Sequence, residues 1–171
     1  LLEYAIGVAA IVAISLLLTR RLTARMRGRI RQAEDQLEQL ALYDTVTGLP
    51  NRRLFEQELR AAVSRVNRQS KGAALLFIDV DDFKKVNDSL GHEAGDKVLA
   101  MIANRLRGAT RTSDVVARLG GDEFAAILYA IGSPDNAAHV AREMVAAIAA
   151  PFDTKPAAHV GVSIGIAMLP E

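Results

Sequence analysis

Cysteine and tryptophan are absent from these 171 residues, histidine occurs three times, and aromatic residues make up only 5% of the chain. Without cysteine there is no disulfide framework and no thiolate ligand, which fits a reducing compartment and argues against a zinc site. No GxxxxGK[ST] segment occurs, so the sequence contains no Walker A phosphate loop. The composition thus sets aside disulfide scaffolds, thiolate zinc chemistry and P-loop nucleotide binding.

The formal net charge is +1, but the basic residues are unevenly placed. Six arginines fall within residues 20–31 with no acid among them, whereas from Asp44 onward the chain has 15 basic and 16 acidic residues. A near-neutral domain with few aromatics is poorly suited to gripping a nucleic-acid backbone, so no nucleic-acid partner is expected. Half of the residues are hydrophobic, which is ample for the core of one modest domain.

One long apolar stretch covers residues 4–19, and the arginines follow it directly. It is slightly shorter than the ~20 residues that cross a bilayer, but the first residue is Leu1, so we expect the span to begin upstream. We therefore predict a partial transmembrane helix over residues 1–19, with the arginines on its cytoplasmic side. The alternatives are a buried core helix, which six arginines rarely follow, and a secretory signal, whose positive charge would precede the apolar run.

Residues 20–43 are expected to form a linker helix, because Gly28 is the one helix breaker before Tyr43. Apolar residues recur in this stretch at spacings of three and four, close to a heptad seam, at Leu22, Met26, Ile30, Ala33, Leu37 and Leu40. This pattern predicts a signalling helix that pairs two chains, with a solvated linker helix as the alternative. Gly48 and Pro50 then break the pattern, and we place a domain at residues 44–171.

The domain is organised around residues 120–123 (GGDE), which separate two apolar segments at 115–119 and 124–129. Adjacent glycines favour a tight β-hairpin, because both central residues can take positive φ. The hairpin is expected to lift Asp122 and Glu123 to the tip of a sheet, where like charges repel unless a cation or a substrate proton lies between them. A solvated turn is the alternative.

A second acidic segment lies upstream at residues 77–84 (FIDVDDFK). The apolar run before it is typical of a buried strand, and Asp79 lies where that strand is predicted to stop. If this strand neighbours the hairpin, Asp79 meets Asp122 and Glu123 at one edge of the sheet. Three converging carboxylates make a hard-oxygen site suited to Mg²⁺ or Mn²⁺.

The second acidic segment turns directly into a predicted short helix. Backbone N–H groups at a helix start are free to bind anions, so phosphates can lie against residues 81–85. Lys84 or Lys85 would add positive charge there.

In this order the motifs resemble the GGDEF domain, the diguanylate cyclase family, over roughly residues 41–169. Five segments carry the resemblance, and together they are far more specific than any one of them. They are residues 42–52 (LYDTVTGLPNR), 77–84 (FIDVDDFK), 87–96 (NDSLGHEAGD), 118–124 (RLGGDEF) and 162–167 (VSIGIA).

The resemblance implies roles for residues at the metal and catalytic centre. Asp79, the carbonyl of Val80 and Asp122 would bind two Mg²⁺ (or Mn²⁺) ions per active site, with Glu123 as a further ligand. The implied catalytic residues are Asp122, Glu123 and Lys84. Asp122 would assist deprotonation of a ribose hydroxyl, and Lys84 would face the reacting phosphates.

The resemblance also implies a GTP site and a separate product site. The residues implied in GTP binding are Phe83, Lys84, Asn87, His92 and Asp96. An Asp carboxylate can accept hydrogen bonds from both N1–H and the exocyclic amine of guanine, a pair that adenine does not offer. Arg111 and Asp114 resemble the family's RxxD inhibitory site, where product binds away from the active site; a surface ion pair is the alternative.

The predicted elements follow the order strand–helix–strand–strand–helix–strand, a ferredoxin-like α+β core with a mainly antiparallel sheet flanked by helices. Strands are expected at 73–78, 115–119, 124–129 and 160–168, and helices at about 52–68, 95–107 and 136–150. The family resemblance agrees and adds a likeness to the polymerase palm. It also implies a further helix and strand, so we expect a fragment cut at both ends, with the C-terminal end of the domain missing.

By resemblance, two GTP become cyclic di-GMP and two pyrophosphates. One domain holds one GTP, so a homodimer must bring two domains face to face, and a pairing linker helix would raise their effective concentration. The implied place is a bacterial-type inner (cell) membrane, with the catalytic domain in the cytoplasm. The alternatives are a catalytically silent GTP-binding module that regulates a downstream domain such as a phosphodiesterase, a membrane-tethered dimerisation scaffold, and cyclisation within one nucleotide.

Overall fold

A computed structural model gives the fold and describes residues 20–21, 26, 40–69, 72–154 and 158–169. The chain divides into two compact units, Leu1–Ala41 and Leu42–Glu171. The described residues of the first unit are helical, and Met26 and Leu40 are 63% and 65% exposed. The predicted transmembrane helix and the other apolar positions of the linker lie outside the described residues. Within the described ranges, no helix is long and apolar enough to cross a membrane.

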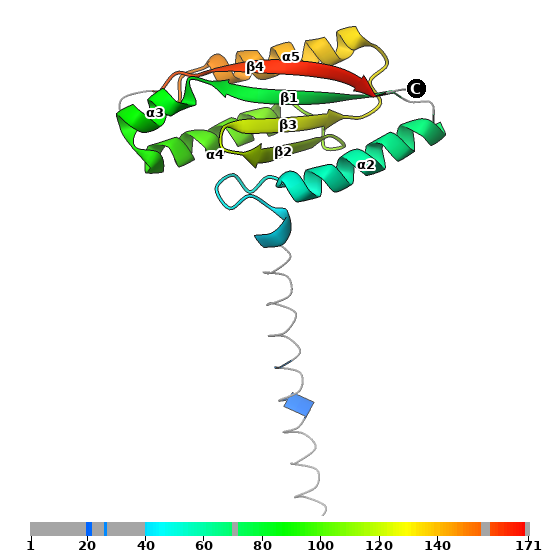
Figure 1. The fold of residues 1–171 in the computed structure, drawn as a ribbon, viewed down its shortest axis with the longest axis horizontal. Helices are drawn as coiled ribbons and strands as arrows, with labels where there is room; N and C mark the ends of the chain where they lie inside the picture. The colour runs from blue at the N-terminus through cyan, green and yellow to red at the C-terminus, as the bar shows by residue number, and fades with distance from the viewer. Residues whose placement is uncertain (1–19, 22–25, 27–39, 70–71, 155–157, 170–171) are drawn as a thin grey trace, which may run out of the picture. The chain divides into compact units, whose positions relative to one another are not determined.

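The second unit is an α+β domain, and its elements run in the order α2 (Arg52–Gln69), β1 (Ala73–Asp81), α3 (Phe83–Leu90), α4 (His92–Gly108), β2 (Val115–Gly120), β3 (Glu123–Leu128), α5 (Pro134–Ala149) and β4 (Gly161–Leu169). The described strands form one sheet in the order β2-β3-β1-β4, and every neighbouring pair is antiparallel (Figure 1). The α+β prediction with an antiparallel sheet flanked by helices is confirmed.

Two predicted element ends were wrong by three residues, each for a local reason. Strand β1 does not stop at Asp79, because β4 continues to pair with it as far as Asp81 opposite Gly161. Helix α4 starts at His92, three residues early, directly after the positive-φ residue Gly91. Helix α5 starts at Pro134, within two residues of its expected start, and the Ser133 hydroxyl caps it by accepting from the Asn136 amide at 3.3 Å.

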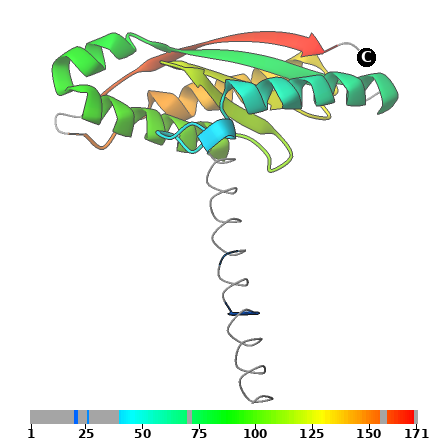
Figure 2. The same cartoon turned by 60° about the horizontal axis from the view of Figure 1, so that its bottom comes forward.

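Two apolar layers hold the sheet, one on each face. Alternate residues of β1, such as Leu76 and Ile78, pack against α4 and α5 to make the larger core. On the other face, Phe55 and Ala62 of α2 cover Ile127 of β3 and its neighbours in β2. Figure 2 shows α4 and α5 together on one face. Helix α3 and the start of α4 lie near the turn between β2 and β3, at one end of the sheet (Figure 1).

A largely buried ion pair fastens the loop before α2 to the β2–β3 hairpin. Arg118 Nη1 lies 3.1 Å from Oδ1 and 3.2 Å from Oδ2 of Asp44, and the Arg118 side chain is only 10% exposed. The same guanidinium donates to the Gly121 carbonyl from Nε at 2.9 Å and from Nη2 at 2.7 Å. The Thr47 hydroxyl and amide donate to Asp44 Oδ1 at 2.7 and 2.8 Å. Asp44 therefore connects this loop, through Arg118, to the hairpin turn.

We expect Asp44→Asn to destabilise the domain in a pH-dependent way. Burial alone raises the pKa of Asp44, but hydrogen bonds from Thr47 and Arg118, with the Arg118 charge, outweigh it and lower the pKa below 3.8. A lowered carboxyl pKa adds stability above the unfolded value and loses it as the pH falls through the folded value. The free energy of unfolding should drop by about 1–2 kcal/mol at neutral pH.

Urea denaturation at several pH values measures this effect. The difference between Asp44→Asn and the parent should begin to shrink as the pH falls below 3.8 and disappear once the pH has passed the lowered pKa of the folded-state carboxyl. Glu56→Gln, at an exposed position on α2, serves as the control. A loss of stability that stays constant across this pH range would contradict the charge-based account.

Candidate active site

The hairpin turn is shifted by one residue from its predicted position. Gly120 still pairs with Glu123, after a bulge between Arg118 and Gly120, so the two turn residues are Gly121 and Asp122. Gly120 and Gly121 have φ of +146° and +54°, values that favour glycine. Asp122 therefore lies at the tip as expected, whereas Glu123 is already the first residue of β3.

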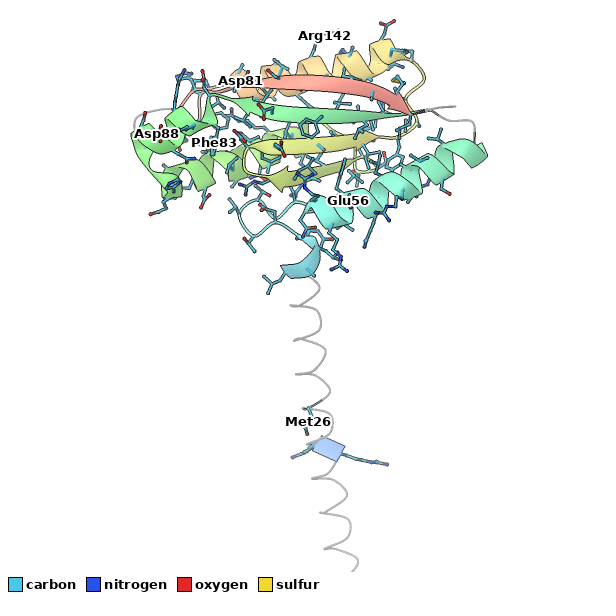
Figure 3. The ribbon with its side chains drawn as sticks, viewed as in Figure 1. Met26, Glu56, Asp81, Phe83, Asp88 and Arg142 are labelled. Atoms are coloured by element: carbon cyan, nitrogen blue, oxygen red, sulfur yellow. The ribbon has the colours of Figure 1, made fainter. Side chains whose placement is uncertain are left out.

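Strand β1 brings its acids to the same end of the sheet as this turn. Asp79 lies directly opposite Glu123 in the β1–β3 register, and the Val80 amide donates to the Asp122 carbonyl at 3.2 Å. Asp81 follows on the same face of β1, and its Oδ1 accepts from the Ser163 hydroxyl of β4 at 2.7 Å. Figure 3 labels Asp81 near the end of β1. The structure thus places the three predicted carboxylates at one end of the sheet, with a fourth acid, Asp81, farther along β1.

The electrostatics of this edge favour a cation. Partial desolvation and then the negative charges of Asp122, Asp81 and Glu123 raise the pKa of Asp79. Arg52 supplies part of the opposing charge, with Nη2 3.2 Å from Glu123 Oε2 and Nε donating to the Leu119 carbonyl at 3.2 Å.

The residues at this edge fit a hard divalent metal by the type of donor they offer. Asp79, Asp122 and Glu123 offer carboxylate oxygens, and Val80 offers a carbonyl, which are the ligands that Mg²⁺ and Mn²⁺ prefer. Among the described side chains, no three acidic or histidine residues converge closely enough to hold an ion as they stand. Metal binding would therefore draw the carboxylates together against their mutual repulsion.

A cavity of about 360 Å³ adjoins the acidic edge. Its lining includes all five residues predicted to bind GTP and also Asp122, so one space contacts both sets. The lining residues are Phe83, Lys84, Asn87, His92, Asp96, Leu99, Arg118, Gly121 and Asp122. The sequence did not predict that Leu99 and Arg118 line this cavity. For Arg118, its place at the start of the RLGGDEF segment could have indicated it.

At the start of α3, Lys84 and Lys85 have different surroundings. Asp82 has φ +57° and ψ +22°, and this left-handed residue turns the chain from β1 into α3. Lys85 Nζ forms an ion pair with Asp82 Oδ2 at 2.9 Å. Lys84 lines the cavity instead. Lys84 is thus the lysine placed to meet a bound phosphate.

Arg111 and Asp114 lie at a second cavity of about 370 Å³, which shares no lining residue with the first. The Asp114 carboxylate accepts from the Arg111 amide at 3.0 Å and from the Tyr129 amide at 3.1 Å. Asp114 therefore orders the 111–114 turn and joins it to the end of β3. Arg107 of α4 also lines this cavity and was not foreseen from the sequence.

We expect Asp79→Asn to stabilise the metal-free protein. A carboxyl with a raised pKa costs stability once it ionises, so stability falls as the pH rises above 3.8 and through the folded value. At neutral pH the neutral amide should raise the Tm by a few degrees. Millimolar Mg²⁺ should raise the Tm of the parent and have little effect on the variant. Thermal unfolding with and without Mg²⁺ measures both; an unchanged Mg²⁺ response in Asp79→Asn would rule out this residue as a ligand.

Comparison with known proteins gives a consistent family. Residues 41–171 match the family model described as "Diguanylate cyclase, GGDEF domain". Diguanylate cyclase TpbB of Pseudomonas aeruginosa is 44% identical over 147 residues, which are 85% of this chain and 34% of that protein. Cyclic di-GMP phosphodiesterase NbdA of the same species is 40% identical over 126 residues, 71% of this chain and 16% of that protein. The chain thus spans about a third or less of these relatives.

Solved structures agree with this family. The GGDEF domain of PA1120 (TpbB or YfiN) from P. aeruginosa matches with a TM-score of 0.72 and 45% identity, over 75% of this chain and 76% of that one. The coiled coil and GGDEF domain of DgcB from Caulobacter crescentus, in complex with c-di-GMP, matches with a TM-score of 0.78 and 26% identity, over 88% and 82%. From its sequence, its sheet and its acidic hairpin, the chain belongs to the GGDEF domain family of diguanylate cyclases.

Proposed function

We propose that residues 44–171 form the catalytic domain of a diguanylate cyclase, which converts two GTP into cyclic di-GMP and two pyrophosphates. One observation carries the proposal: the cavity contacts the predicted base-binding residues Asn87 and Asp96 and also Asp122 of the acidic edge. A nucleotide whose base lies at α3 and α4 would extend its phosphates toward Lys84 and that edge.

In the proposed reaction, the 3′-oxygen of one GTP attacks the α-phosphorus of the other. The O3′–Pα bond forms, the bond from Pα to the bridging oxygen of pyrophosphate breaks, and the exchange repeats to close the ring. Asp122 accepts the proton of the 3′-hydroxyl, and Glu123 supports it from the first position of β3. Lys84 stabilises charge on the phosphates. Phe83, labelled in Figure 3 at the start of α3, and His92 line the cavity and would surround the nucleotide.

Asp79, the Val80 carbonyl, Asp122 and Glu123 would hold two Mg²⁺ or Mn²⁺ ions. When bound, the ions would lower the pKa of the attacking hydroxyl and stabilise negative charge on the α-phosphate. The raised pKa of Asp79 agrees with this part of the proposal: its first cause is partial desolvation, and its second is the negative charge of Asp122, Asp81 and Glu123, which a cation would offset. Arg52 would have to share Glu123 with the metal, since their side chains are 3.2 Å apart.

The proposed enzyme works as a homodimer, because each domain supplies one nucleotide cavity of this kind and the product joins two nucleotides. The heptad-like spacing in residues 20–43 supports pairing through that helix. The apolar run and the arginines after it support an anchor at residues 1–19 in a cell membrane, with the catalytic domain in the cytoplasm. Chemical crosslinking in membrane fractions tests both parts.

Cyclic di-GMP would also restrain the enzyme from the second cavity. Arg111 is exposed at that cavity and can bind a phosphate bidentately or stack on a purine. Asp114 is already bonded to two backbone amides, so its contribution would combine ligand binding with holding the turn. The separation of the two cavities supports control through a distinct site rather than competition.

A second candidate function is a catalytically silent GTP-binding domain that regulates a neighbouring domain. The similarity to NbdA favours it, because that protein is named a phosphodiesterase although it matches this chain over 126 residues. Asp79, Asp122 and Glu123 argue for catalysis, since binding alone does not require three carboxylates at one edge of the sheet.

Product analysis decides between these functions. We expect the full-length protein, incubated with GTP and Mg²⁺, to form cyclic di-GMP and pyrophosphate, identified by mass. Asp122→Ala should lower the rate by about 10²-fold or more, because it removes both a charge at the metal site and the proton acceptor. Glu56→Ala, an exposed acid on α2, should match the parent. Retained GTP binding with no product in the parent would select the regulatory function.

Arg111→Ala should separate product inhibition from catalysis. We expect its initial rate to equal that of the parent, while the slowing that accompanies cyclic di-GMP accumulation disappears. Cyclic di-GMP affinity, measured by calorimetry on each variant, should fall by about tenfold or more, because a charge-assisted contact to phosphate is lost. Arg60→Ala on α2 is the control for loss of an exposed arginine. Inhibition of Arg111→Ala at parental product concentrations would exclude this site.

A further inference from the structure

Helices α3 and α4 approach each other at Gly95, the fourth residue of α4. Gly95 is buried, and its amide donates to the Gly91 carbonyl at 3.1 Å. Its φ lies outside the positive range at which Gly91 and the hairpin glycines are found. The backbone at this position would therefore accept any L-residue, and the reason for glycine must be the space around it.

That space is taken by the side chain of Asn87. A Cβ built on Gly95 would lie 1.9 Å from Asn87 Oδ1 and 3.1 Å from Asn87 Cγ, and 3.3 Å from Cζ of Phe83. The first distance is far below van der Waals contact, so an alanine would force the Asn87 amide to move. Phe83 and Asn87 both line the nucleotide cavity, and Gly95 lies directly behind them.

Gly95 also precedes Asp96, the other residue proposed to bind the base. Asn87 comes from α3 and Asp96 from α4, so the separation of these helices sets the distance between the two polar groups. We propose that Gly95 is a positioning residue for guanine binding: by having no side chain, it lets the Asn87 amide keep its place in the cavity that Asp96 also lines. This inference rests on the proposed GTP site and assigns how its geometry is fixed.

A second glycine of the same helix shows that helical structure alone does not require Gly95. Nothing lies within 4 Å of a Cβ placed on Gly108, at the last position of α4. Glycine in a helix is less favourable than alanine, so Gly→Ala at an uncrowded helical position tends to stabilise the fold. Glycine at Gly95 therefore lowers the stability of the helix, and the Asn87 side chain, which occupies the space of a Cβ, explains why glycine is nevertheless found there.

The test compares Gly95→Ala with Gly108→Ala, two identical changes in one helix. Binding of α,β-methylene GTP with Mg²⁺ is the readout, because this analogue lacks the α–β oxygen bridge that the reaction breaks. We expect Gly95→Ala to bind the analogue at least tenfold more weakly and Gly108→Ala to bind it like the parent. Under turnover with GTP, Gly95→Ala should raise KM by a similar factor with a smaller change in kcat. Equal affinity for Gly95→Ala and the parent would overturn the inference.

A double variant separates positioning of Asn87 from general packing of α3 on α4. Asn87→Ala removes the atoms that an alanine at position 95 would displace. We expect Asn87→Ala and the pair Asn87→Ala with Gly95→Ala to bind the analogue equally, and any loss of Tm in Gly95→Ala to be recovered in the pair. If Gly95→Ala lowered the affinity equally in the parent and in Asn87→Ala, the inference would be overturned, and the general packing of α3 on α4 would explain the loss. The parent is measured first, and a parent that fails to bind the analogue would overturn the proposed GTP site as well.

Discussion

Repulsion between carboxylates at one end of the sheet is the constraint on which the site depends. Antiparallel pairing places Asp79 opposite Glu123, with Asp81 farther along β1 and Asp122 at the adjoining turn. Partial desolvation and then the neighbouring negative charges raise the pKa of Asp79, so the ionised carboxylates at this edge oppose the folded state. The sheet holds them together because β1 is paired on both sides and its alternate residues are fully buried.

Arginines restrain this end of the sheet at its margins. Arg118 ties the Gly121 carbonyl to Asp44, and Arg52 joins Glu123 to the Leu119 carbonyl. Both arginines act on backbone carbonyls of the hairpin as well as on acids, so they help to fix the position of the turn. The acidic groups are therefore ordered before any cation binds, although their charge is only partly offset.

Much of the fold could be predicted from the sequence, because the apolar runs, the glycine turn and the helix signals agree with one another. The positions of Asp79 and Glu123 were the harder part. A run that ends in Asp-Val-Asp looks like a strand end, and only pairing with β4 extends β1 to Asp81. Likewise, GGDE predicts a hairpin, but the bulge after Arg118, which moves Glu123 into β3, depends on three-dimensional strain and pairing.

The residues that sequence reasoning missed act across large separations in the chain. Arg118 binds Asp44, which lies 74 positions earlier in the chain. The need for glycine at Gly95 becomes clear only when the side chain of Asn87, from the preceding helix, is seen to occupy the space next to it. Arg107 looked like an ordinary charged residue of an amphipathic helix until its cavity was visible. Periodicity reports which face of an element is buried, but it carries no information on which distant side chain occupies a given space.

The position of β1 in the sheet has a consequence for how the domain folds. Both of its partners, β3 and β4, come later in the chain, and Asp81 finds Ser163 across 82 residues. Such long separations slow folding, because the chain loses the entropy of closing a large loop before the strand pair contributes any contact energy. The carboxylates are therefore still apart while the local helices form, and they meet only when the central strand is enclosed. We therefore expect the unfavourable charge cluster to be assembled late in folding, after most of the apolar surface is buried.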